Sequence, residues 1–152
     1  MYSAILFLHS YWRWVVVLAA LIALGHATLG WAAGRPYSPR ARAVGRAFVG
    51  ALDLQLLLGL LLYVFLSPYT RAAFADLGHV MKNPFYRFWT VEHGPVQLLA
   101  VVSAHVGSVR AKRAPDDRTR YRQSAIFTGI ALLLILIAMP WPGLDIGRPL
   151  FR

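Results

Sequence analysis

The stretch that decides the fold is Ala4–Ala33, which reads AILFLHSYWRWVVVLAALIALGHATLGWAA. Arg13 is its one side chain that is charged at neutral pH. A bilayer core of about 30 Å requires about 20 mostly apolar helical residues, so this stretch predicts a membrane-spanning helix. No basic segment precedes it and its apolar part is too long for a cleaved signal peptide, so we expect it to be retained.

Three further segments have the same apolar character. They run Ala47–Leu66, Arg87–Val109 and Ser124–Met139, and the prolines that follow the last one are expected to end its helix. The whole chain has a mean hydropathy of +0.52. Only 14% of its residues are charged, against about 25% in soluble proteins. The sequence therefore predicts an all-α fold in which residues 1–152 form a single bundle of four transmembrane helices.

Basic residues gather in two of the three predicted loops. They are Arg35, Arg40, Arg42 and Arg46 in the first loop, and Arg110, Lys112, Arg113, Arg118, Arg120 and Arg122 in the third. The positive-inside rule places both loops in the cytoplasm, and the two termini and the longer middle loop, Ser67–Tyr86, outside it. We expect a multi-pass protein of the bacterial inner membrane. This topology explains the net charge of +10, so we exclude nucleic-acid binding and expect contact with anionic membrane lipid.

Ionisable side chains inside the predicted spans fall into two layers. The outer layer holds His9, Arg13, Glu92 and His93, and the inner layer holds His26, Asp53 and His105. Such groups are rare and costly in a membrane and mark functional sites. The chain has no cysteine, which excludes disulfides, thiolate metal sites and cysteine-ligated iron–sulfur clusters. Any cofactor must therefore be held by histidine, methionine, carboxylate or shape.

His9 and His93 favour one haem b. Both are expected about 8–9 Å below the outer surface, on spans that run in the same direction. Two neutral imidazoles on opposite faces of one iron are the ligands of a low-spin haem. We therefore expect these two histidines to be the axial ligands of the haem iron. Contact with a quinone or another non-haem cofactor, and purely structural hydrogen bonding, stay open as alternatives.

Four other residues are expected to shape this haem site: Arg13, Arg87, Gln97 and Gly59. The two arginines lie toward the outer ends of their spans and are expected to bind haem propionates, with Glu92 as an alternative partner for the first. The glutamine lies one turn after His93 and can donate a hydrogen bond into the pocket. The glycine allows a flat macrocycle to approach the backbone closely.

His26, Asp53 and His105 form a candidate second site, because their expected depths of about 7–11 Å from the inner surface match. The angular positions fit a second haem less well. His9 and His26 are 17 residues apart, about 100° around the helix, and His93 and His105 are 12 apart, about 120°. Besides a second haem, a buried polar network, a proton path and a zinc or iron site stay open here.

Several short motifs are similar to those of small bacterial four-helix membrane proteins catalogued as cytochrome-b-like. They are His9–Trp14, Leu54–Gly59, Arg87-Phe88 with Glu92-His93, Pro140–Pro142 and Gly147–Arg152, which together span nearly the whole chain. This resemblance implies haem b and electron transfer. His9 and His93 lie within the motifs, whereas His26 and His105 do not, and this asymmetry agrees with a single haem.

The function expected from these observations is electron transfer between a quinone and a periplasmic partner. The protein could act alone, as a homo-oligomer, or as a subunit of a larger respiratory or photosynthetic complex. Two rivals stay open: a non-catalytic structural or assembly subunit, and a small proton- or metal-conducting protein that uses the inner layer. No nucleophile–base pair or phosphate-binding loop is visible, so no catalytic residue is assigned.

Overall fold

The computed structural model describes residues 1–150, and within that range the chain is helical and contains no strand. Its elements are α1 (Tyr2–Ala32), α2 (Pro39–Leu61), a π-helical turn (Leu62–Leu66), α3 (Pro68–Ala75), α4 (Leu77–Lys82), α5 (Pro84–Arg87), a second π-helical turn (Phe88–Glu92), α6 (His93–Arg113) and α7 (Asp117–Ile137). The all-α prediction is confirmed. The last two residues of the C-terminal motif, Phe151 and Arg152, lie outside the described residues.

Three helices in the described part of the chain are long and apolar enough to cross a membrane: Tyr2–Ala32, Pro39–Leu66 and Asp117–Ile137. They correspond to the first, second and fourth predicted spans. The helix at the third predicted span is α6, which is as long as α7. Polar residues such as Gln97, Ser103 and His105 interrupt its apolar sequence. The membrane character of the first, second and fourth predicted spans thus follows from length and composition, and that of the third, α6, stays a prediction.

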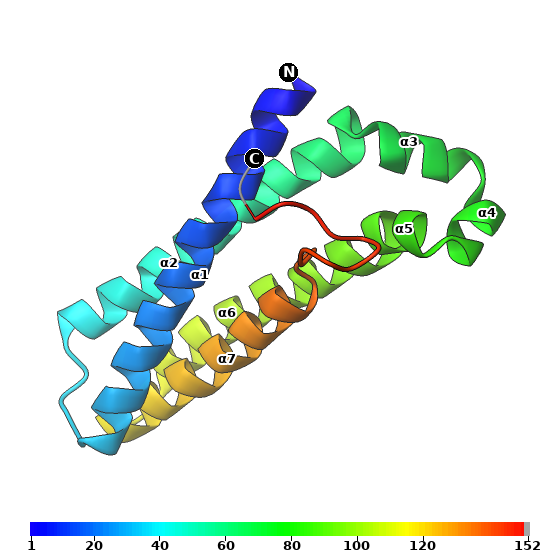
Figure 1. Ribbon diagram of the computed structural model, residues 1–152. Helices are drawn as coiled ribbons and strands as arrows, with labels where there is room; N and C mark the ends of the chain where they lie inside the picture. The colour runs from blue at the N-terminus through cyan, green and yellow to red at the C-terminus, as the bar shows by residue number, and fades with distance from the viewer. Residues whose placement is uncertain (151–152) are drawn as a thin grey trace.

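The four long helices pack in a fixed pattern of neighbours (Figure 1). α6 lies along α7, and α1 packs against both α7 and α2, while α2 makes a smaller contact with α6. Their shared core is made by buried side chains from all four helices: Val16, Ala20, Phe48, Leu52, Ala104 and Leu132, among others. Small residues recur in this core because they let helix backbones approach closely inside a membrane.

One consequence concerns Gly107, where α6 packs closely against α7. A Cβ at this position would overlap the Cβ of Phe127 on α7. We expect Gly107→Ala to lower the stability by about 1–3 kcal/mol, the usual cost of overpacking. Gly25→Ala is the matched control, because nothing lies within 4 Å of its added Cβ. Thermal unfolding in detergent checks this, and equal melting temperatures for the two variants would contradict the close packing.

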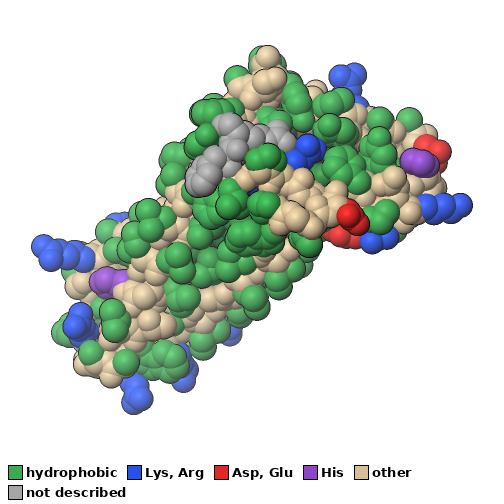
Figure 2. Space-filling model, viewed as in Figure 1, with side chains coloured by type: hydrophobic (Ala, Val, Ile, Leu, Met, Phe, Trp, Pro, Cys, Tyr) green, Lys and Arg blue, Asp and Glu red, His purple; other side chains and the backbone are tan. Residues whose placement is uncertain are grey.

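The two ends of the bundle differ in structure and in charge. At one end α1 and α2 are joined by a tight turn in which Gly34 adopts φ 59°, a conformation that favours glycine. The α6–α7 turn lies at the same end (Figure 1). On the face shown in Figure 2, lysine and arginine side chains appear at both ends, whereas aspartate and glutamate appear only at the end that carries the short helices. The first and third predicted loops, which carry most of the basic residues, therefore lie together at one end of the bundle.

At the opposite end the predicted middle loop is mostly helical. Its short helices α3, α4 and α5 are capped by the residues that precede them, Ser67, Asp76 and Asn83. Each cap side chain accepts a hydrogen bond from a backbone N–H in the first turn. Pro68 and Pro84 occupy the first helical positions of α3 and α5, where the missing N–H costs nothing. The segment after α7 returns across this end toward α1 (Figure 1).

Candidate functional site

A cavity of about 420 Å³ lies at the end of the bundle that carries the short helices. This volume is in the range of small-molecule and cofactor sites. Its lining comes from α1, α2, both π-helical turns, α3, α6, the end of α7 and the segment after it. It includes His9, Arg13, Gln55, Gly59, Tyr63, Tyr69, Trp89, His93, Gln97, Met139 and Arg148. Three of the four residues of the predicted outer layer, His9, Arg13 and His93, thus line one cavity, whereas Glu92 does not.

The imidazoles of His9 and His93 face each other in this cavity. Their ring centroids are 6.4 Å apart and their planes are inclined by 70°. With metal–imidazole bonds of about 2.0–2.1 Å, two imidazoles on opposite sides of one metal ion have ring centroids about 6–6.5 Å apart. The distance between the two ring centroids is therefore long enough to admit one metal ion between the imidazoles.

His93 is held in the tautomer that a metal ligand needs. Its Nδ1 lies 2.8 Å from the carbonyl oxygen of Ala138, and a neutral imidazole must donate from this nitrogen to make that hydrogen bond. The lone pair is then on Nε2. Metal-binding histidines commonly donate their other N–H to a backbone carbonyl in this way. The rings of Phe88 and Trp89, at 5.6 and 5.5 Å, hold the imidazole from its sides.

The backbone before His93 forms a wide turn for a local reason. Pro95 has no N–H to donate to the carbonyl one turn earlier, and its ring crowds that carbonyl. The π-helical turn Phe88–Glu92 lies immediately before this position and widens the helix. Such turns occur frequently at functional sites. His93 follows this turn as the first residue of α6 and lines the cavity.

His9 is held from the opposite side by α2. Gln55 donates from Nε2 to the carbonyl oxygen of His9 at 3.1 Å and lies 3.3 Å from its ring Nε2. The His9 Nδ1 is buried and has no hydrogen-bond partner among the described residues. A buried polar group left unsatisfied costs about 1–3 kcal/mol. This cost favours a ligand in the cavity.

Gly59 forms the wall next to His9. A Cβ on this residue would lie 3.2 Å from the Cε1 of the imidazole, tighter than ordinary van der Waals contact. Gly59 also follows Gln55 by four residues, so both face the cavity from one side of α2. The predicted role of Gly59, to let a flat macrocycle approach the backbone, stays a prediction, since the neighbour that the structure shows is the His9 imidazole.

The other predicted site residues divide between the cavity and its surroundings. Arg13 and Gln97 line the cavity, whereas Arg87 is absent from its lining. Arg13 donates to the carbonyl oxygens of Pro149 and Leu150, at 3.2 and 2.6 Å. Gln97 donates to the Ile135 carbonyl oxygen at 3.4 Å.

Arg87 forms an ion pair with Glu92, with Nε and Oε1 2.6 Å apart. Glu92 was the alternative partner expected for Arg13, and the structure gives it to Arg87 instead. The spacing explains this, because the π-helical turn brings two residues five apart onto one side of the chain.

Arg148 is a cavity residue that the sequence did not single out for this role. It lines the cavity and its guanidinium lies over the rings of Tyr69, Phe85 and Trp89, at 5.6, 5.4 and 5.2 Å. Cation–π contacts of this kind hold a charged group without neutralising it. Its membership in the C-terminal motif was the available signal, but only the fold shows which cavity that motif closes.

The inner layer is divided in the structure. His105 Nε2 and Asp53 Oδ1 are 2.8 Å apart between α6 and α2, and about half of each side chain is exposed. His26 lies elsewhere, with its ring centroid 6.1 Å from that of Tyr121 on α7. In the part of the chain that the structure describes, no three histidine or acidic side chains form a group able to hold a metal ion. Two of the three residues of the predicted inner layer thus meet, and the third packs against a different helix.

Comparisons of the chain with known protein families, with characterised proteins and with solved structures find no significant match. The function is therefore argued from the geometry of the cavity and from the distribution of apolar and charged residues.

Proposed function

We propose that this chain is a membrane-embedded b-type haem protein that transfers electrons, with one haem between α1 and α6. The observation that carries the proposal is the pair of imidazoles, His9 and His93, whose centroids lie 6.4 Å apart across a cavity. A haem bound there supplies an iron that accepts and releases one electron at a time.

The donor set of the cavity supports a haem in three respects. The Nδ1–H···O bond to Ala138 leaves a lone pair on His93. The Nδ1 of His9 is buried without a partner among the described residues. Gly59 leaves open the space beside the His9 ring, which a Cβ would narrow. A cavity with these features suits a flat, apolar ligand with a metal at its centre.

Two arginines in the lining provide the positive charge that haem propionates require. Arg13, predicted for this role, and Arg148, which the fold adds, both line the cavity. Arginine binds carboxylates with two parallel hydrogen bonds. Arg87, which lies outside the cavity lining, could also bind a propionate if that carboxylate replaced Glu92 as its ion-pair partner. Gln97, one turn beyond His93, remains a hydrogen-bond donor within the pocket.

We propose four membrane spans, with α6 as the additional one. Its exposed residues include the apolar Leu98, Leu99, Val102, Val106 and Val109, together with Ser108 and with His105, which pairs with Asp53 of α2. Ser103 is buried and donates to the Phe127 carbonyl oxygen at 3.0 Å, so it faces the protein, as polar groups in membrane helices should. The basic turns then lie in the cytoplasm and both termini outside, in a bacterial inner membrane.

The proposed partners follow from the position of the haem. A quinone within the bilayer and a redox protein outside the membrane are the two partners that an outer-layer haem can reach. A homo-oligomer, or a parent respiratory or photosynthetic complex, would cover the exposed apolar faces of the bundle. A second haem near His26 and His105 stays a weaker proposal, because the two residues lie against different neighbours.

The test of the proposed function is the absorption spectrum of the protein purified in mild detergent. We expect a Soret band and, in the reduced-minus-oxidised difference, the α band of a b-type haem, with one haem per chain. Haem extraction and quantification against protein concentration give the stoichiometry. Protein expressed with ample haem that shows no Soret band would overturn the proposal and favour a structural or assembly subunit.

A further inference from the structure

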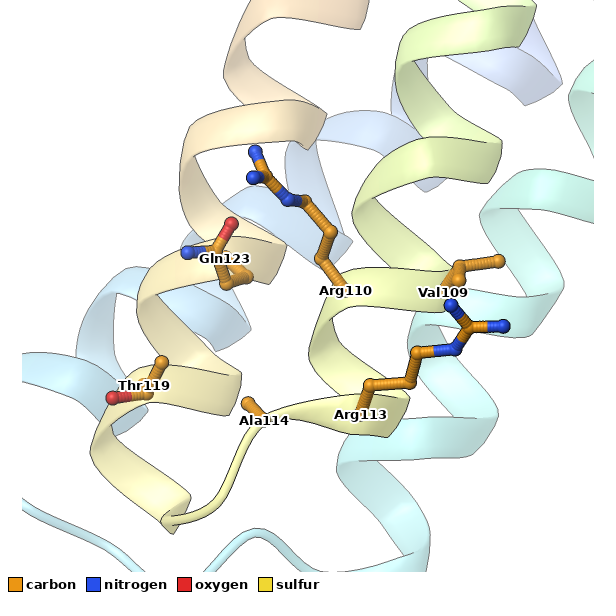
Figure 3. A pocket seen from close by; sticks show the side chains of 6 residues that line it. All are labelled: Val109, Arg110, Arg113, Ala114, Thr119 and Gln123. Carbon is orange, nitrogen blue, oxygen red and sulfur yellow. The ribbon is translucent and has the colours of Figure 1, made fainter.

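A second hollow lies between α6 and α7 at the basic end of the bundle, at the end of α6 opposite His93. Its volume is about 330 Å³. Six residues line it: Val109, Arg110, Arg113, Ala114, Thr119 and Gln123. Figure 3 shows these side chains around the turn that joins the two helices. Figure 3 also shows that the Arg110 side chain points toward α7 and that the Arg113 side chain points away from it, beside Val109, so the two guanidinium groups flank the hollow from different sides.

The two arginines carry positive charge that the described part of the chain does not neutralise. Neither Arg110 nor Arg113 forms an ion pair with a described carboxylate, whereas the nearby Asp117 pairs with Arg120, with Oδ1 and Nη1 3.3 Å apart. Residues 110–123 hold six basic and two acidic side chains, a net charge of +4. The hollow is thus suited to an anion.

The remaining acid of the turn, Asp116, is occupied as a helix cap. Its Oδ1 accepts from the Thr119 backbone N–H and its Oδ2 from the Thr119 hydroxyl, both at 2.8 Å. These hydrogen bonds lower the pKa of the Asp116 carboxyl group below its usual value, and the bond from the backbone N–H has the larger effect. A cap of this kind fixes the start of α7, so the wall of the hollow contributed by Thr119 is held in place.

Arg110 is also positioned by packing. Its guanidinium lies 5.4 Å from the centroid of the Phe127 ring. Phe127 in turn packs against Gly107, where a Cβ would overlap it. Figure 3 shows the Arg110 side chain extending between the two helices toward Gln123. The arginine is therefore held beside the hollow by an aromatic ring and keeps its hydrogen-bond donors for a ligand.

Apolar tracks lead from the hollow along both helices. On α7, Gln123 is followed on the same face by Ile126, Ile130 and Leu133, which are 43%, 44% and 58% exposed. On α6, Val109 is preceded by Val106 and Val102, which are 39% and 48% exposed. Spacings of three and four residues keep each track on one side of its helix. A ligand with a charged head and apolar chains would follow these tracks.

We propose that this hollow binds the phosphate headgroup of an anionic phospholipid, with its acyl chains along the exposed tracks of α6 and α7. The hollow lies where the apolar part of α7 ends and the basic turn begins, which is the depth of lipid phosphates at the cytoplasmic surface. Basic pockets between membrane helices on this side bind anionic headgroups. The site needs membrane insertion in the proposed orientation, but it does not depend on haem.

The experiment titrates phosphatidylglycerol and phosphatidylcholine into detergent-purified protein and counts bound lipids by native mass spectrometry. Wild type should retain one phosphatidylglycerol per chain in preference to phosphatidylcholine. In Arg110→Gln/Arg113→Gln we expect the affinity for phosphatidylglycerol to fall on the order of 30-fold, because each arginine near a membrane surface contributes about fivefold. The control Arg40→Gln/Arg42→Gln removes the same charge from the other basic turn and should leave this binding unchanged.

Three results would overturn the proposal. An equal loss in both double variants would show diffuse attraction to the basic end. Equal affinity for the two lipids would show that the apolar tracks bind without the arginines. Binding of inorganic phosphate as tightly as phosphatidylglycerol would show a site for a soluble anion. If the double variant does not fold, Arg113→Gln alone replaces it, because this side chain makes no hydrogen bond or ion pair with the described residues.

Discussion

His93→Ala should yield a folded membrane protein that retains almost no haem, and His9→Ala should do the same. Each substitution removes one axial ligand and the lone pair that it supplies. Partners in the outer shell of a metal site are already worth 10- to 100-fold in affinity, so loss of a ligand itself should cost at least that much. The haem content per chain, measured by extraction after purification, checks both variants.

The control for this pair is His26→Ala. His26 lies on the same helix as His9 but packs near Tyr121, away from the cavity lining. Haem content in this variant should equal that of wild type. If His26→Ala removes about half of the haem while His9→Ala removes the other half, two haems are bound and the single-site assignment is wrong. Full haem content in His93→Ala would exclude that residue as a ligand.

Gly59→Leu should block the cavity without removing any ligand. An added Cβ already lies 3.2 Å from His9 Cε1, so the larger side chain must occupy the space beside the imidazole. Overpacking costs about 1–3 kcal/mol, and if that cost falls on the bound state alone the haem affinity drops about 5- to 150-fold. Haem titration of the apoprotein in detergent measures this change.

Gly50→Leu is the matched control on the same helix. A Cβ at Gly50 has nothing within 4 Å, and Gly50 does not line the cavity. Its haem affinity should equal that of wild type. Equal affinities for Gly59→Leu and wild type would show that the ligand does not lie against this wall of α2.

The sequence located the long helices of this fold because apolar length depends on local composition, but it missed two of their starts. The helix α2 begins at Pro39 and not at Ala47, and α7 begins at Asp117 and not at Ser124. The helix α1 begins and ends within two residues of the predicted Ala4–Ala33 span, and His9 and His93 meet as the depth argument required. Depth is predictable since each residue of a helix adds a constant rise. The third predicted span, α6, was harder to establish as a membrane helix, because its polar residues lower its hydropathy even where they face the protein.

Other features of the site depended on contacts between distant segments. Gln55 meets His9 across 46 positions, and Arg148 reaches the cavity because the segment after α7 folds back over it. Sequence periodicity could place Gln55 and Gly59 on one face of α2, but it could not identify the helix that this face contacts. The separation of His26 from Asp53 and His105 has the same origin. The rotation of each helix about its axis is set by packing, and the pattern of one helix alone does not determine it.

The central claim is that one iron is bound by the two imidazoles of His9 and His93, and low-temperature electron paramagnetic resonance of the oxidised protein tests it most directly. With two imidazole ligands inclined as steeply as the 70° between these rings, we expect a low-spin ferric signal with strong anisotropy in wild type. In His93→Ala that signal should disappear, leaving at most a high-spin signal from residual haem. A high-spin spectrum in the wild-type protein, or a low-spin spectrum that survives His93→Ala unchanged, would contradict the account.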